Sequence, residues 1–77
     1  MTRFETGIEY VTRYIGDHDL IITSKIIART EKTVTALINN REQKTFRIKV
    51  WNGEEQFYPE GRFSFAPIMS ASRIKAA

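Results

Sequence analysis

Residues 45–58 of this 77-residue chain read T-F-R-I-K-V-W-N-G-E-E-Q-F-Y, and the predicted fold is built around this stretch. Two runs of strand-favouring residues flank Asn52 and Gly53. A two-residue type I′ turn needs a positive φ at both central positions, which glycine adopts freely and asparagine tolerates. The stretch therefore predicts a β-hairpin that turns at these two residues.

Counting outward from the turn predicts which side chains share a face of the hairpin, because directly opposed residues lie on the same side. The predicted opposed pairs are Trp51 with Glu54, Val50 with Glu55, Lys49 with Gln56, Ile48 with Phe57, and Arg47 with Tyr58. One face is apolar and is predicted to enter the core; it carries Phe46, Ile48, Val50 and Phe57. The other face is basic and aromatic and is predicted to point outward; it carries Arg47, Lys49, Trp51, Gln56 and Tyr58. Glu55, next to the turn, is expected at the rim of the sheet.

The rest of the chain repeats this pattern of short strands separated by turns. Residues 8–15, 20–30 and 33–38 are rich in β-branched residues, and residues 62–69 contain Pro67, which favours an edge strand or a packed extended segment. The sequence therefore predicts a single all-β domain over residues 1–77. We expect a small antiparallel barrel or curled sheet of about five strands, SH3-like or OB-like, with a short C-terminal extension.

Short loops set the expected pairing of the middle strands. With loops at 30–32 and 39–43, the expected pairs are Ala28 with Val34, Ile26 with Ala36, Ala36 with Phe46, and Val34 with Ile48. This register keeps one face apolar across all of these strands. It also places Ile27 and Leu37 on the outer face, where we expect another segment to cover them.

The composition indicates a small cytoplasmic protein without a membrane partner. The chain has no Cys, its first residues form no apolar signal region, and no apolar run approaches the length that spans a bilayer. A chain of this size has a marginal core. Closure of the sheet or association into a homodimer would add stability.

The sequence offers little for catalysis. Its only histidine, His18, lies in the turn-like segment G-D-H-D, and no second His or Cys is present to complete a metal site. Glu54 and Glu55 are adjacent, so on a strand they point to opposite faces and do not form an acid–base pair. There is no Gly-rich phosphate loop and no nucleophile elbow. We expect no enzymatic activity, no cofactor and no metal.

The basic and aromatic face of the hairpin is the best candidate for a binding site. The net charge is +3, and the bases are concentrated in residues 25–49. The predicted binding residues are Arg47, Lys49, Trp51 and Tyr58, with Lys25 and Arg29 as an electrostatic margin. Aromatic rings flanked by Lys and Arg suit single-stranded nucleic acid, because rings stack on bases and cations neutralise phosphates.

Two other interpretations of this face stay open at the level of sequence. A host protein would suit it as well, since Trp, Tyr and Arg dominate protein interfaces. Alternatively, Trp51 and Tyr58 have a purely structural role, packed along the stem of Lys49 or beneath the terminal segments.

Two segments are similar to paired motifs of a known group of proteins. Residues 28–35 read A-R-T-E-K-T-V-T, and residues 61–68 read G-R-F-S-F-A-P-I. They resemble the R-T-x-K-T-V and G-R-[FY]-S-x-A-P motifs of small, mostly uncharacterised accessory proteins of bacterial phages, plasmids and conjugative elements. Phe65 stands where that group usually has Met. The resemblance makes Arg62 and Phe63 of the second motif candidate functional residues. It also implies a protein that handles the element's nucleic acid or blocks a host defence complex, as anti-CRISPR and anti-restriction proteins do.

Overall fold

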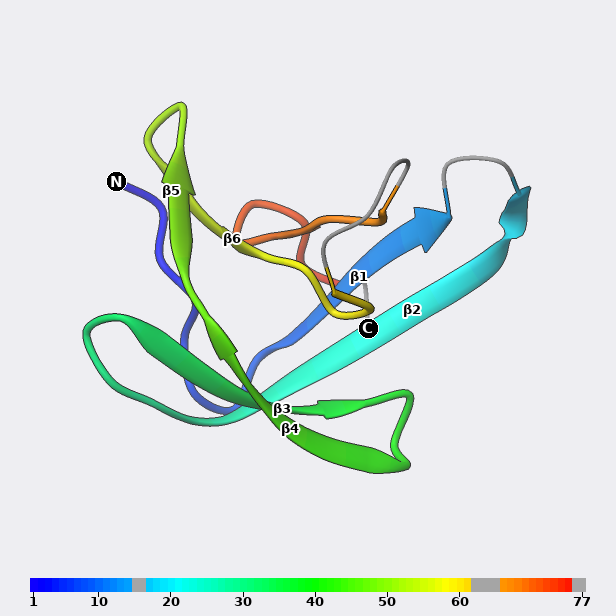
Figure 1. Cartoon of the computed structure of the whole chain (residues 1–77), viewed down its shortest axis with the longest axis horizontal. Helices are drawn as coiled ribbons and strands as arrows, with labels where there is room; N and C mark the ends of the chain where they lie inside the picture. Colours follow the sequence, from blue (N-terminus) through cyan, green and yellow to red (C-terminus); the bar gives the residue numbers. More distant parts are fainter. Residues whose placement is uncertain (15–16, 62–65, 76–77) are drawn as a thin grey trace.

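The computed structural model describes residues 1–14, 17–61 and 66–75, and these residues form seven β-strands (Figure 1). The strands are β1 (Glu9–Tyr14), β2 (Asp17–Arg29), β3 (Thr33–Ile38), β4 (Glu42–Arg47), β5 (Lys49–Trp51), β6 (Glu54–Phe57) and β7 (Met69–Ser70). The prediction of an all-β chain is confirmed. Among the described residues there is no helix of the length and apolar character that a membrane crossing requires.

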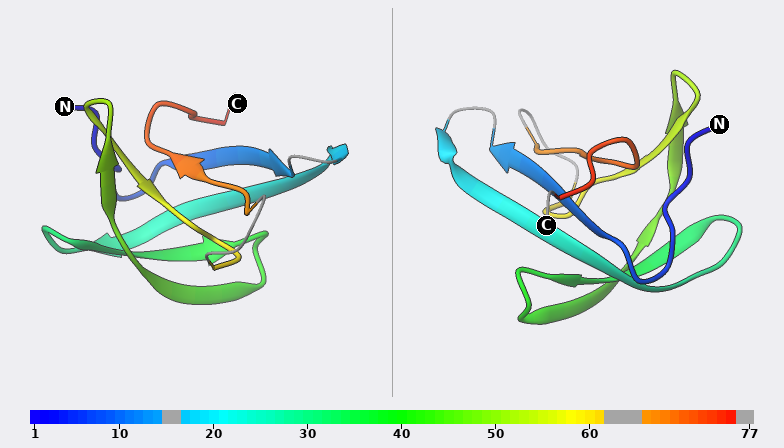
Figure 2. Two further views of the ribbon diagram at one scale, coloured as in Figure 1. Left: turned by 45° about the horizontal axis from the view of Figure 1, so that its top comes forward. Right: turned by 180° about the vertical axis from the view of Figure 1, so that it is seen from behind.

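The strands form two antiparallel sheets. One sheet has the order β1-β2-β3-β4, and the other has the order β5-β6-β7. Only Ile48 separates β4 from β5, so a single run of chain passes from one sheet to the other (Figures 1 and 2). An isolated bridge between Tyr10 and Ile74 ties the C-terminal segment to β1. The described strands do not form a closed barrel, and they number seven rather than the predicted five.

The hairpin around Asn52 and Gly53 has the predicted register. Both residues have a positive φ, 49° and 75°, as a type I′ turn requires. The paired residues of β5 and β6 are Lys49 with Gln56, Val50 with Glu55, and Trp51 with Glu54. The turn chemistry alone therefore predicts correctly which side of β5 carries Lys49 and Trp51.

A β-bulge in β2 determines the face on which Arg29 lies. The observed pairs across β2 and β3 include Ile26 with Ala36, Ala28 with Thr35, and Arg29 with Val34. The first pair is as predicted, but the predicted pair of Ala28 with Val34 is wrong. Ile27 is the extra residue, so the alternation of faces is interrupted and Arg29 joins Val34 on the inner side.

The pairing of β3 with β4 is displaced by two residues from the predicted register. The observed pairs include Val34 with Phe46 and Ala36 with Lys44. The predicted pairs of Val34 with Ile48 and of Ala36 with Phe46 are therefore wrong. The connection is tighter than expected, because Asn39 and Asn40 adopt positive φ values of 52° and 59° in a short turn. A displacement by two keeps each side chain on its face, so the apolar side of β3 still faces the core.

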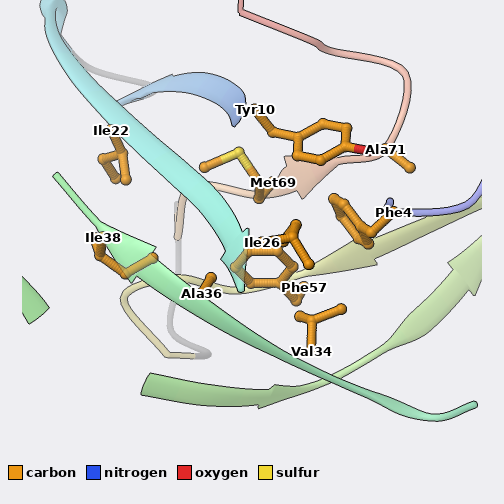
Figure 3. Packing of buried hydrophobic residues seen from close by; sticks show 10 residues of the cluster. All are labelled: Phe4, Tyr10, Ile22, Ile26, Val34, Ala36, Ile38, Phe57, Met69 and Ala71. Carbon is orange, nitrogen blue, oxygen red and sulfur yellow. The ribbon is translucent and has the colours of Figure 1, made fainter. Parts of the chain in front are cut away.

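Phe57 lies in the middle of the hydrophobic core (Figure 3). The centre of its ring is 5.1 Å from that of Phe4 and 4.7 Å from that of Phe46. Phe4 in turn meets the ring of Tyr10 edge-on at 4.9 Å. The buried apolar residues around these rings are Ile22, Ile26, Val34, Ala36, Ile38, Met69 and Ala71. Because Phe4 is 1% exposed, the N-terminal segment before β1 is part of the core.

The predicted apolar row of the hairpin is only partly buried. Phe57 is fully buried and Phe46 and Ile48 are partly buried, but Val50 is 54% exposed. Its partner Glu55 is the buried member of the pair, at 1% exposure, so the expectation that Glu55 lies at the rim is wrong. β5 is the outermost strand of its sheet, which is why Val50 borders solvent.

Candidate nucleic-acid interface

Lys49 and Trp51 lie on one side of β5, because alternate residues of a strand share a face. Lys49 Nζ is 5.9 Å from the centre of the Trp51 ring and 6.0 Å from the centre of the Tyr58 ring. Both distances are at the limit of about 6 Å within which a cation is attracted to a ring face. The ammonium group therefore lies within reach of two aromatic rings at once.

A surface groove opens beside this ammonium group. Its lining residues are Lys49, Trp51, Gln56, Tyr58 and Ile68, and we call it the aromatic groove. Trp51 is 58% exposed and Ile68 is 37% exposed, so both present apolar surface to a ligand. The interpretation in which terminal segments cover Trp51 is wrong. Ile27, on the other sheet, also lacks the expected cover, since 41% of its surface is exposed.

Arg47 extends the aromatic groove toward the four-stranded sheet. An adjoining hollow is lined by Arg47, Ile48, Lys49 and Tyr58. Lys49 and Tyr58 line both spaces, so the two are contiguous. In the described part of the chain, no ion pair includes Arg47 or Lys49. The structure thus brings together four of the predicted binding residues: Arg47, Lys49, Trp51 and Tyr58.

Hydrogen bonds hold the polar wall of the aromatic groove in place. Gln56 Nε2 donates to Glu54 Oε1 and to Ser70 Oγ, both at 3.2 Å. Hydrogen bonds from Ser72 and Gln56 lower the pKa of Glu54, so this carboxylate stays charged across the strand from Trp51. A phosphate is repelled at that end, and we therefore expect it nearer to Lys49.

Arg29 does not line the aromatic groove, because the bulge in β2 turns it inward onto Glu55. Arg29 Nη1 is 2.6 Å from Glu55 Oε1 and Nη2 is 2.9 Å from Glu55 Oε2. Nη1 also donates to the carbonyl of Phe4 at 2.7 Å. The hydrogen bond between the two side chains raises the pKa of Arg29 and lowers that of Glu55. We interpret this guanidinium as a structural cation that joins β2, β6 and the N-terminal segment.

The remaining predicted residues are not in the aromatic groove. Lys25 is exposed on β2, where it pairs across the sheet with Glu9 and Leu37, and its contribution as an electrostatic margin stays a prediction. Arg62 and Phe63 lie outside the described residues. Conversely, Ile68 lines the groove although no signal in the sequence marks it, since it belongs to an irregular segment just before β7.

The described residues contain no group of three or more His, Cys, Asp or Glu side chains that could hold a metal ion. Comparison of the chain with protein-family models, with curated proteins and with solved structures found no match. The resemblance to mobile-element accessory proteins therefore stays a prediction. Function is inferred from the geometry of the aromatic groove.

Proposed function

We propose that this protein binds single-stranded nucleic acid at the aromatic groove and catalyses no reaction. The observation that carries the proposal is the position of Lys49 Nζ, 5.9 Å from the Trp51 ring and 6.0 Å from the Tyr58 ring. An exposed ring stacks on a base while the neighbouring ammonium neutralises a phosphate. Every base has a π-face, so this contact tolerates any sequence. An accessory protein that handles the nucleic acid of a mobile element would need such tolerance.

The groove favours a single strand over a duplex. Bases in a duplex are stacked on each other, so their faces do not reach a protein ring, whereas unpaired bases are free to do so. Arg47 and Lys49 form no ion pair with the acids of the described residues, so no such pair neutralises their positive charge and it is available to an anionic ligand. Phosphates along the strand are the matching anions.

We further propose that the two sheets curl into a partly open barrel of the SH3-like or OB-like kind. Support comes from the passage of β4 into β5 across Ile48 and from the bridge between Tyr10 and Ile74. In OB-folds an exposed strand face and the adjacent loops bind oligonucleotides, and the aromatic groove is likewise lined by strand residues, Lys49 and Trp51 of β5 and Gln56 of β6.

Replacing Trp51 with alanine is expected to weaken the binding of a fluorescein-labelled oligothymidylate by roughly 5- to 150-fold, because one base stack is worth about 1–3 kcal/mol. Fluorescence anisotropy at low salt measures the affinity. Trp51 is the only Trp of the chain, so its own fluorescence should be quenched when wild type binds. The wild-type affinity should also fall steeply as salt rises, since released counterions drive the binding.

A lysine outside the groove provides a matched control. Lys75 Nζ lies 3.7 Å from Glu9 Oε1 beside β1, and its replacement removes the same charge as replacement of Lys49. Lys75→Ala should bind as wild type does, whereas Lys49→Ala should bind more weakly. If wild type gives no change in anisotropy at low salt, the protein does not bind single strands and the proposal is wrong.

A second candidate function is binding of a host protein, as an inhibitor of a host enzyme or defence complex. It is favoured by the apolar surface that Trp51 and Ile68 expose in one groove, at 58% and 37%. Exposed Trp at the centre of a contact is typical of protein interfaces. Capture from host lysate by wild type and by Trp51→Ala tests it: a partner that both retain equally does not use the aromatic groove.

A further inference from the structure

β5 has a second side, which borders a hollow separate from the aromatic groove. Its apolar lining is Met1, Ile48 and Val50, its cations are Arg3, Lys32 and Arg47, and we call it the basic hollow. Arg47 and Ile48 also line the hollow beside Tyr58 that adjoins the aromatic groove. The hollow beside Tyr58 therefore lies between the basic hollow and the aromatic groove, and it shares Arg47 and Ile48 of the β4–β5 junction with the basic hollow.

The charge of the basic hollow is positive. Its three cations are opposed by two acids, Glu31 and Glu55. The charge of Glu55 is already balanced, because Arg29 holds both of its carboxylate oxygens, at 2.6 and 2.9 Å. Arg3 Nε lies farther from this carboxylate, at 3.6 Å, and 48% of the Arg3 side chain is exposed. Glu31 alone therefore opposes three cations, and the hollow attracts anions.

Two of these cations project from backbone that hydrogen bonds hold against the hairpin. The carbonyl of Lys32 accepts from the N–H of Ile48 at 2.7 Å. The turn around it is closed by Thr30 Oγ1, which accepts from the N–H of Lys32 at 3.3 Å and from that of Thr33 at 3.1 Å. These hydrogen bonds order the loop that carries Lys32, and Lys32 lines the basic hollow beside the β4–β5 junction.

The segment that carries Arg3 is anchored in a similar way. The N–H of Thr2 donates to the carbonyl of Gly53 at 2.8 Å, and the N–H of Glu55 donates to the carbonyl of Thr2 at 2.9 Å. Figures 1 and 2 show this N-terminal segment alongside the β5–β6 hairpin. Arg3 and Lys32 therefore approach the basic hollow from two sides, and both lie on pre-ordered chain.

The described lining of the basic hollow contains no aromatic ring, in contrast to the aromatic groove. Val50 and Met1 contribute exposed apolar surface, at 54% and 71%. A site with cations and aliphatic surface but no ring suits the sugar–phosphate backbone rather than stacked bases.

We infer that a bound single strand continues from the aromatic groove past Arg47 into the basic hollow, where Arg3 and Lys32 hold the phosphates of the following nucleotides. This inference rests on the proposed function, because it extends the same binding site. It divides the ligand into a segment whose bases stack on Trp51 and Tyr58 and a segment that is held by its backbone alone.

The test compares short and long labelled oligothymidylates, of about 3 and about 12 nucleotides. The variant is Arg3→Ala combined with Lys32→Ala, and thermal unfolding checks that it folds. Lys75→Ala is the control for the loss of one positive charge outside the site. We expect the double variant to bind the long strand about tenfold more weakly and the short strand as wild type does. For the long strand, the slope of log K against log salt should become shallower by about 1.4, or about 0.7 for each lost phosphate contact.

Each outcome separates the inference from the proposed function. If Trp51→Ala weakens both lengths and the double variant changes neither, the strand does not enter the basic hollow, although the aromatic groove still binds it. Equal weakening of both lengths by the double variant would also overturn the inference, because the effect would not depend on the added nucleotides. Lys32→Ala alone repeats the test at a residue without an ion pair in the described chain, in case the double variant unfolds. If wild type binds neither length, the proposed function fails.

Discussion

At the scale of single residues, Glu55 is a buried carboxylate that several donors hold in place. It is 1% exposed, and its carboxylate accepts hydrogen bonds from Arg29 and from the N–H of Phe4, the latter at 2.8 Å. A buried carboxylate is tolerated when it is paired and its oxygens have donors. Because Arg29 belongs to β2, Glu55 to β6 and Phe4 to the N-terminal segment, this one group joins three parts of the chain.

Replacing Glu55 with alanine is expected to lower the free energy of unfolding by roughly 3 kcal/mol, because Arg29, whose side chain is 16% exposed, loses its carboxylate partner. Urea unfolding followed by circular dichroism measures the change. Arg3→Ala is the control, since the exposed ion pair of Arg3 with the same carboxylate should contribute less than about 1 kcal/mol. Equal losses in the two variants would contradict a dominant role for Arg29.

Ser24 shows the opposite case, a buried polar group without a partner. Ser24 Oγ makes no hydrogen bond in the described structure, and the residue is fully buried. Ser24→Ala is expected to leave the free energy of unfolding unchanged or to raise it by up to about 1 kcal/mol, because the cost of desolvating the hydroxyl is removed. Ser70→Ala is the matched control: Ser70 is 8% exposed but accepts a hydrogen bond from Gln56, so its loss should cost about 1 kcal/mol. The same urea titration measures both, and a clear destabilisation by Ser24→Ala would contradict the explanation.

At the scale of elements, the short strand β5 is the part on which binding depends. Its two sides border different spaces, because Lys49 and Trp51 point to the aromatic groove while Val50 points to the basic hollow. A one-residue change of register would exchange these sides. The turn at Asn52 and Gly53 therefore affects the site directly, although neither residue lines either space.

Gly53→Ala is expected to destabilise the protein by about 1 kcal/mol, because Gly53 has φ 75° and a residue with a Cβ adopts that backbone reluctantly. Apart from Gly53 and its two chain neighbours, no heavy atom lies within 4 Å of the position of the new Cβ, so the cost is conformational rather than a clash. Gly53→Asn should cost less than Gly53→Ala, since asparagine tolerates positive φ. Thermal unfolding gives the ranking, and an alanine variant as stable as wild type would show that the turn does not need glycine.

At the scale of the whole molecule, segments far apart in sequence connect the two sheets. Arg29 and Glu55 are 26 residues apart, and the bridge between Tyr10 and Ile74 joins the C-terminal segment to β1. The chain has no Cys, so no disulfide supports these connections. The ion pair of Arg29 with Glu55 joins β2 of one sheet to β6 of the other, so we expect the overall stability to depend on the ionisation of this pair.

The stability of the protein is expected to fall at acid pH. The hydrogen bond from Arg29 lowers the pKa of Glu55 in the folded state, below the value of about 4.3 for an unfolded chain. The ion pair therefore stabilises the protein fully above that pH, and the contribution is lost as the pH falls through the folded-state pKa. Urea unfolding between about pH 7 and about pH 3 measures this loss.

Glu55→Gln is the control for the pH dependence, because its amide does not titrate. Its free energy of unfolding should be lower than that of wild type at neutral pH and should change less toward acid pH. Some dependence should remain, since the pKa of Glu54 is lowered as well. An acid dependence identical to that of wild type would assign the loss to other carboxylates.

The sequence by itself determined the all-β class, the hairpin at Asn52 and Gly53, and the side of β5 that carries Lys49 and Trp51. These features depend on local backbone preference and on the alternation of side chains along a strand, which both act over a few residues. The pairing of Ile26 with Ala36 belongs to the same group.

Only the tertiary structure decided the rest of the candidate site. The bulge at Ile27 turned Arg29 inward onto Glu55, and the N-terminal segment supplied both Phe4 to the core and Arg3 to the basic hollow. Ile68 reached the aromatic groove from a segment without regular alternation. Each of these placements depends on packing between parts of the chain that are distant in sequence, and no local preference of backbone or side chain determines which distant partner a residue meets.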